Sequence, residues 1–129
     1  MSLTYYLKFK KKLDEKPELK LLIDNHDNKF FIISDLFSST FTLVESYFDD
    51  YEINFEFENA SKIMFNVVKK DADPIIFRKS ILQIIHKITN EIYPDEDYFF
   101  DFNGDFVHEL RENGIVKRNS KTDFYEGLD

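Results

Sequence analysis

Two Asn-Gly pairs near the C-terminus constrain the fold more than any other feature of this sequence. Asn103-Gly104 and Asn113-Gly114 lie ten residues apart, the first between 97–102 and 105–110 and the second between 105–110 and 115–119. Asn-Gly favours the two-residue type I′ hairpin turn, because both turn positions need a positive φ angle. The spacing therefore predicts three sequential antiparallel strands, at 97–102, 105–110 and 115–119.

A long amphipathic helix is predicted before this meander. Asp73-Pro74 is a helix start, with Asp73 as the N-cap and Pro74 at the first helical position, and the helix should end before Pro94. A shorter helix is predicted to begin near Asp14 and to stop in the turn-forming stretch 24–28. The long helix carries apolar residues on one face: Phe77, Ile81, Ile84, Ile85, Ile88 and Ile92.

The remaining elements are strands. Alternation predicts strands at 3–10 and 52–58, and 29–34 has the composition of a buried strand. We expect 62–69 to be the hairpin partner of 52–58. The stretch 35–44 is open between a strand, a short helix and a packed loop.

Together these elements predict an α+β fold. It is an antiparallel sheet with a C-terminal three-stranded meander, packed by one short N-terminal helix and one long central amphipathic helix. The 129 residues suit a single domain, 1–129. About 120–129 are expected to form a flexible tail or an edge segment.

Composition excludes several classes of function. The chain has no cysteine, so it has no disulfide framework, no thiolate nucleophile and no zinc knuckle. No glycine precedes Gly104, which excludes the P-loop, the dinucleotide fingerprint and the Gly-x-Ser-x-Gly elbow. A net charge of −8 argues against non-specific binding of nucleic acid.

The sequence also argues against a membrane location. Its longest uncharged run is nine residues, 36–44, whereas a spanning helix needs about 20. The N-terminus lacks the apolar core and the cleavage site of a secretion signal. A cytoplasmic protein is therefore expected.

No metal or cofactor site is predicted. The stretch 24–27 has the composition of a helix-ending turn rather than a ligand set. The acidic stretch 95–105 places Phe100 and Phe106 where a calcium loop needs glycine and glutamate. The zincin-like stretch 108–112 lacks its second histidine.

No catalytic residue is predicted either. In the expected hairpin Asp101 lies opposite Phe106, and His108 is diagonal to Asp101 on the same face. A polar contact across the strands is the simpler interpretation, because no local motif delivers a serine for a triad. His86 lies off the apolar stripe of the long helix and is expected to be exposed.

An acidic stripe is the most informative polar feature. Between Glu45 and Glu58 there are six acids and no base. One interpretation is an ordinary solvated strand face; the other is a surface that docks on a basic protein, with tyrosine and phenylalanine side chains as anchors. The candidate binding residues are Asp49, Asp50, Tyr51, Glu52, Glu56 and Glu58.

Both ends of the chain resemble a known family. The opening 1–5 leads into a strand and a short helix, and the closing 97–105 leads into 111–114 after a long amphipathic helix. This pattern resembles the small bacterial immunity proteins of swarming-inhibition and contact-dependent polymorphic toxin systems. Glu96 stands where that family tends to have a glycine, and Asp105 where it tends to have a glutamate.

The resemblance implies a cytoplasmic antidote without catalytic residues. Such a protein binds one cognate toxin, the C-terminal domain of an effector, and neutralises it. It acts on neither nucleic acid nor membrane and is expected to be a monomer or a weak dimer.

Two other classes of function remain open. One is a small-molecule-binding or hydrolytic domain, with a pocket between the sheet and the long helix lined by Tyr98, Phe100 and His108. A deep pocket that holds a group with a perturbed pKa would favour it. The other is a structural subunit, which a large exposed apolar patch on a strand edge would favour.

Overall fold

The computed structural model describes most of the chain. The described residues are 3–10, 13–14, 16–25, 31–36, 40–48, 51–59, 61–68, 73–102, 106–119 and 124–128. The elements follow in the order β1 (Leu3–Phe9), α1 (Pro17–Asn25), β2 (Phe31–Leu36), β3 (Thr40–Phe48), β4 (Tyr51–Asn59), β5 (Ser61–Val67), α2 (Pro74–Lys87), η1 (Ile88–Ile92), β6 (Tyr98–Phe102), β7 (Phe106–Glu112) and β8 (Ile115–Arg118).

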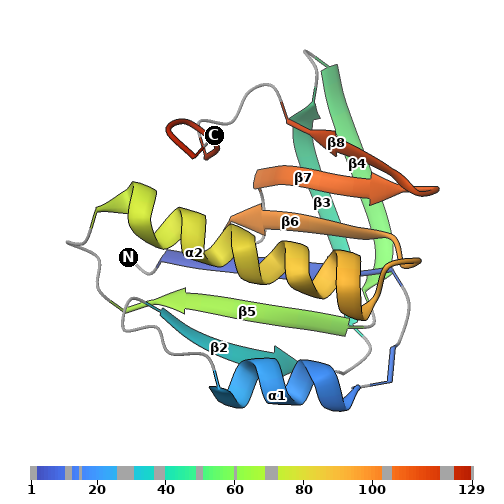
Figure 1. Ribbon diagram of the computed structural model, residues 1–129. Helices are drawn as coiled ribbons and strands as arrows, with labels where there is room; N and C mark the ends of the chain where they lie inside the picture. The colour runs from blue at the N-terminus through green and yellow to red at the C-terminus, as the bar shows by residue number, and fades with distance from the viewer. Residues whose placement is uncertain are drawn as a thin grey trace.

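Six of the strands form one antiparallel sheet in the order β2-β5-β1-β6-β7-β8 (Figure 1). The N-terminal strand β1 lies inside this sheet, where it pairs with β5 and β6. The last three strands form the predicted meander. The structure therefore confirms the α+β class, the two helices of unequal length and the C-terminal meander.

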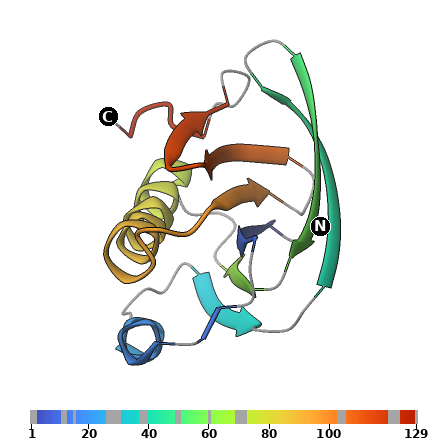
Figure 2. The same ribbon diagram turned by 90° about the vertical axis from the view of Figure 1, so that its right-hand side faces the viewer.

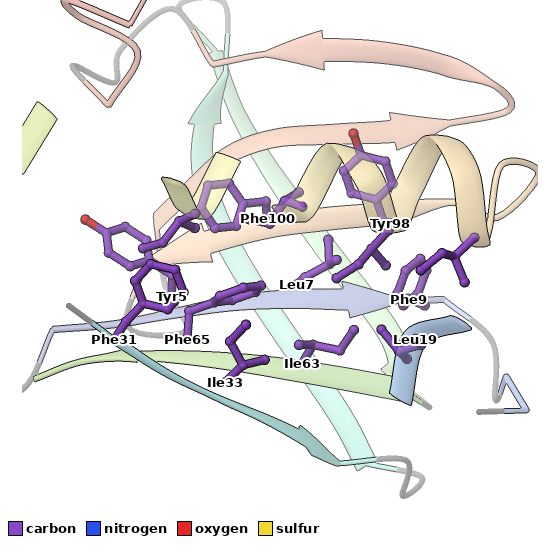
Figure 3. Close-up of a cluster of buried hydrophobic side chains, with 14 of the residues drawn as sticks. Tyr5, Leu7, Phe9, Leu19, Phe31, Ile33, Ile63, Phe65, Tyr98 and Phe100 are labelled. Carbon is purple, nitrogen blue, oxygen red and sulfur yellow. The ribbon is translucent and has the colours of Figure 1, made fainter. Parts of the chain in front are cut away.

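Both helices cover the same face of the six-stranded sheet (Figure 2). Alternate residues of β1 and β5 point into the core between the sheet and the helices, among them Leu7, Phe9, Ile63 and Phe65 (Figure 3). From α2 the predicted apolar stripe packs against them, with Ile81 and Ile85 fully buried. The apolar residues that repeat every 2 positions in the strands and about every 3.6 positions in the helix thus pack together in one core.

The long helix begins at a side-chain cap and ends in a π-helical turn. The Asp73 carboxylate accepts a hydrogen bond from the Ile75 amide at 3.0 Å, as an N-cap should. The last turn widens into the π-helix η1, where the Tyr93 amide donates to the Ile88 carbonyl, five residues back. Among the described residues, no helix is long and apolar enough to cross a membrane.

Two positively charged side chains bind the carbonyl groups at the carboxyl end of η1. The guanidinium of Arg111, on β7, donates to the carbonyls of Thr89 and Tyr93, each at 2.9 Å, and also to the Glu96 carbonyl. The ammonium of Lys16 donates to the Ile92 carbonyl at 2.8 Å. Positive groups at this position satisfy helix carbonyls that lack partners and complement the helix dipole.

The pairing expected for β5 is wrong. β4 pairs with β3, and the two form a separate two-stranded sheet, whereas β5 pairs with β1 and β2. β5 has Ile63, Phe65 and Val67 on one face, all buried in the core, so it fits the interior of the large sheet better than a solvated hairpin. The ambiguous stretch 35–44 contributes to both β2 and β3.

The register expected for β6 and β7 is also wrong. Phe102 pairs with Phe106, and Asp101 pairs with Val107, so the predicted pair of Asp101 with Phe106 does not form. A β-bulge follows, because Phe100 pairs with Glu109 and leaves His108 as the extra residue. The predicted turn at Asn103-Gly104 lies outside the described residues.

The second Asn-Gly turn is confirmed. Asn113 and Gly114 both have positive φ angles, 54° and 80°, as a type I′ turn requires. They join the paired residues Glu112 and Ile115.

The expectation of a flexible tail at 120–129 does not hold for its described part, Phe124–Leu128. Phe124 is 1% exposed and belongs to the core cluster. Its ring packs on Tyr5, Phe100 and His108, and the neighbouring Tyr125 hydroxyl donates to Glu109, so this segment is docked on the domain.

Candidate functional site

Four of the six candidate toxin-binding residues lie on one strand of a separate two-stranded sheet. We call β3 and β4 together the acidic ribbon, because these two strands contain four glutamates and no lysine or arginine. The ribbon lies on the face of the large sheet opposite the helices (Figure 2). One end of the ribbon reaches past β8 in both views.

The backbone register places the candidates along this ribbon. In β4, Glu52 pairs with Tyr47, Glu56 with Leu43, and Glu58 with Phe41, while Tyr51 pairs with Phe48 near the tip. Tyr51, Glu52, Glu56 and Glu58 are thus brought onto one strand. Asp49 and Asp50 lie outside the described residues.

The sheet face on the ribbon side carries a buried ion pair. The Lys8 ammonium is 3.0 Å from a carboxylate oxygen of Asp101, and both side chains are almost completely buried. Lys8 also lies over the rings of Tyr6 and Phe99, at 5.0 and 5.4 Å from their centroids. Asp101 therefore interacts with Lys8 from β1, not with His108 as expected.

A second polar network lies on the helix side of the sheet, and it is centred on Glu109. One carboxylate oxygen accepts the Tyr98 hydroxyl at 2.7 Å, and the other accepts the Tyr125 hydroxyl at 2.6 Å. Nε2 of His86 lies 3.3 Å from the same carboxylate. Glu109 is fully buried, so these partners take the place of water around its charge.

The network explains the titration of its members. Burial by itself would raise the pKa of the Glu109 carboxyl, but the hydrogen bonds from His86, Tyr125 and Tyr98 outweigh burial and hold that pKa below its usual value. Burial and the nearby Glu109 charge raise the pKa values of the Tyr98 and Tyr125 hydroxyls. At neutral pH the network is therefore an ionised carboxylate with neutral phenols as donors.

The β-bulge in β7 allows this arrangement. Because His108 is the extra residue in the bulge, it and Glu109 both reach the helix side. The ring of His108 stacks on Phe124 at 4.7 Å and lies 5.3 Å from Phe100. The expected contact between His108 and Asp101 is replaced by contacts with core aromatic rings.

The C-terminal turn closes over the network. Phe124 packs edge to face against Tyr5 and Phe100, at centroid distances of 5.5 and 5.2 Å. The Arg118 guanidinium lies 4.1 Å from the centroid of the Tyr125 ring. Gly127 has a φ of +82°, and a Cβ placed there would lie 3.0 Å from a methyl carbon of Ile75.

The three residues proposed to line a pocket are buried among other side chains. Tyr98, Phe100 and His108 do share the helix side of the sheet, but Tyr98 is hydrogen-bonded to Glu109 and the other two rings touch each other. Two cavities of about 200 and 260 Å³ adjoin Asp95 and Glu96 near the end of η1. Both are smaller than the roughly 300–1,000 Å³ of typical ligand pockets.

Sequence reasoning missed the centre of this network. In the sequence, Glu109 belongs to a zincin-like stretch and Tyr125 to an expected tail. His86, expected to be exposed, is partly buried with a side chain 36% exposed. No local signal identifies Glu109, because alternation places it on the same strand face as Asp105 and Arg111, where a polar residue is ordinary.

Comparisons with protein-family models, curated proteins and solved structures find no match to this chain.

Proposed function

We propose that this protein is a non-enzymatic immunity protein that binds and neutralises a cognate toxin domain in bacterial competition. It acts in the cytoplasm, with the C-terminal domain of an effector as its partner. The resemblance of both chain ends to the immunity proteins of polymorphic toxin systems motivates this proposal.

The acidic ribbon is the observation that supports it most. Four glutamates and no base lie on a two-stranded sheet separate from the six-stranded one. The whole chain has a net charge of −8, which accelerates encounter with a basic partner and disfavours wrong ones. Toxin–immunity pairs can reach the upper limit of protein affinity, and charge complementarity contributes to that.

The helix-side network favours binding over catalysis. Glu109 is the group with the chemistry to act as a general base, yet its carboxylate already accepts hydrogen bonds from two tyrosine hydroxyls. A fully buried carboxylate that already accepts these hydrogen bonds stabilises the fold and is shielded from solvent. This argues against the hydrolytic alternative.

A co-expression experiment tests the proposal. The toxin domain encoded next to this chain should arrest growth when expressed alone, and this chain should relieve the arrest and be recovered with the toxin in a stable complex. Arrest without rescue and without a complex would overturn the immunity function.

A pair of charge-reversal variants tests the binding surface. In the first, Glu52, Glu56 and Glu58 are replaced by Lys; in the control, the exposed Glu18, Glu91 and Glu126 are replaced by Lys. Each substitution adds two positive units, so both variants move the net charge from −8 to −2. Loss of rescue in the first variant alone supports the acidic ribbon. Equal effects of both variants would show that only net charge matters.

A further inference from the structure

The face of the large sheet turned away from the helices also carries buried apolar side chains. Phe99 pairs with Leu110 and alternates along β6 with Tyr98 and Phe100 of the helix-side core, so this pair lies on the opposite face. Phe99, Val107 and Leu110 are nevertheless at most 5% exposed. The acidic ribbon lies over this face (Figure 2), and β3 contacts β7. The ribbon is therefore the layer that covers these residues.

The register of the ribbon sorts its residues onto two faces. Residues that pair directly across an antiparallel ladder share a face, and successive residues of one strand alternate between faces. The apolar ribbon face carries no charged residue of β3 or β4, and it includes Val44, Ile53, Phe55 and Phe57. The acidic ribbon face carries all four glutamates, and three of them pair with Phe41, Leu43 and Tyr47. Among the candidate binding residues, Tyr51 belongs to the apolar face.

The two ribbon faces differ in what it costs to pack them on the large sheet. Placing the apolar face against Phe99 and Leu110 removes apolar surface of both sheets from water. Placing the acidic face there would bury four carboxylates beside a cation, Lys8, that already has Asp101 as its partner. The apolar face is thus the one suited to the large sheet, and the acidic face is the one suited to the outside.

We infer that the acidic ribbon face binds a basic protein segment that presents a row of Lys or Arg side chains beside a row of apolar ones. The face has two matching rows, because three glutamates lie on β4 and the apolar Phe41, Leu43 and Tyr47 lie on β3, about 4.8 Å away. The acidic row pairs with the cations, and the apolar row packs on the partner's apolar side chains. A second copy of this chain does not fit, because two such faces would bring their glutamates together.

This inference rests on the proposed function, since it gives the toxin-binding surface one face and the toxin a surface chemistry. It adds Glu45 and the apolar row of β3 to the candidate binding residues and removes Tyr51. It can be tested without the toxin, because the chemistry of the partner segment defines a probe.

The probe is a capped helical peptide of about 18 residues of Lys, Leu and Ala, with the Lys and Leu residues in two adjacent stripes. Titrated into the isotope-labelled full chain at physiological salt, it should give saturable amide shifts centred on β3 and β4, with a Kd below about 1 mM. A scrambled peptide of the same composition keeps the charge but loses the stripes, so it should bind at least about fivefold more weakly. Absence of saturation, or equal binding of both peptides, overturns the inference.

Two neighbouring substitutions separate binding from folding. Leu43 lies on the acidic face and Val44 on the apolar face. Leu43→Ala should weaken peptide binding at least about fivefold and leave the urea midpoint of unfolding in place. Val44→Ala should lower that midpoint and leave the affinity of the folded chain within about twofold. The opposite pattern would place the acidic face against the large sheet and overturn the inference, as would a dimer of the free chain that Leu43→Ala disrupts.

The co-expression experiment distinguishes failure of this inference from failure of the immunity function. Loss of rescue in Leu43→Ala, with rescue retained in Val44→Ala, supports the acidic face as the toxin-binding surface. Rescue by the wild type and by Leu43→Ala alike overturns this face and leaves the immunity function standing. Peptide binding without rescue by the wild type overturns the immunity function and supports the acidic face as a surface for basic segments.

Discussion

Replacing Tyr125 by Phe measures how strongly the Glu109 network holds the C-terminal turn. The Tyr125 hydroxyl donates to Glu109 at 2.6 Å, while the ring of Tyr125 packs against Arg118 and Phe124. Phenylalanine keeps these ring contacts, so the substitution removes one hydrogen bond to a buried charged acceptor. Such a bond contributes about 1.5–3 kcal/mol, and we expect Tyr125→Phe to lower the free energy of unfolding by about 2 kcal/mol at pH 7.

The same substitution should lose its effect in acid. The pKa of Glu109 is lowered in the folded state, so ionised Glu109 stabilises the fold above its unfolded pKa, near the ordinary value of 4.5. This stabilisation is lost as the pH falls through the folded pKa. Below that pH the carboxyl is protonated in both states, and the cost of Tyr125→Phe should become much smaller.

Urea unfolding of the wild type and of Tyr125→Phe at neutral and acid pH provides the measurement. Tyr6→Phe is a control, because it removes a hydroxyl on the other face of the sheet and should cost no more than about 0.5 kcal/mol. In a Glu109→Gln background the cost of Tyr125→Phe should fall, since the charged acceptor is gone. A cost below about 0.5 kcal/mol at pH 7, or one that is independent of pH and of Glu109, would refute the reasoning.

Three further predictions follow from single contacts, each measured by chemical denaturation. Phe124→Ala should cost about 3–5 kcal/mol, because its ring is buried among Tyr5, Phe100 and His108; a cost under about 1 kcal/mol would mean that the C-terminal turn is not docked in solution. Gly127→Ala should lower the free energy of unfolding more than Gly114→Ala does. Both positions have a positive φ, but only a Cβ at position 127 would point at Ile75. Asp101→Asn should cost about 3–5 kcal/mol by leaving Lys8 buried without its counter-charge, and a Lys8→Met/Asp101→Leu double variant should recover most of that loss.

The sequence predicted the elements whose signals are local. The Asp73 cap, the apolar stripe of α2 and the Asn113-Gly114 turn are each formed by residues within a few positions of one another. Hydrogen bonds and side-chain spacing at this range depend little on the rest of the chain. All three are confirmed in the structure.

The errors concern choices between distant partners. Alternation predicted a strand at 52–58, with 62–69 as its hairpin partner, but β4 pairs with β3 and β5 with β1 and β2. Periodicity shows that a strand has an apolar face, but it does not show which sheet the strand joins. The register of β7 likewise differs from the expected one: the pair of Phe102 with Phe106 shifts it by one residue, and the bulge at His108 shifts it by one more.

The sequence by itself determined an acidic, cysteine-free α+β domain, because charge, residue content and local periodicity are properties of the chain alone. Only the tertiary structure decided which polar groups meet. Glu109, His86, Tyr98 and Tyr125 come from four separate segments, and Lys8 meets Asp101 across β1 and β6. Such contacts form because burying the apolar faces brings these segments together, and each charge that is buried with them must find a partner there.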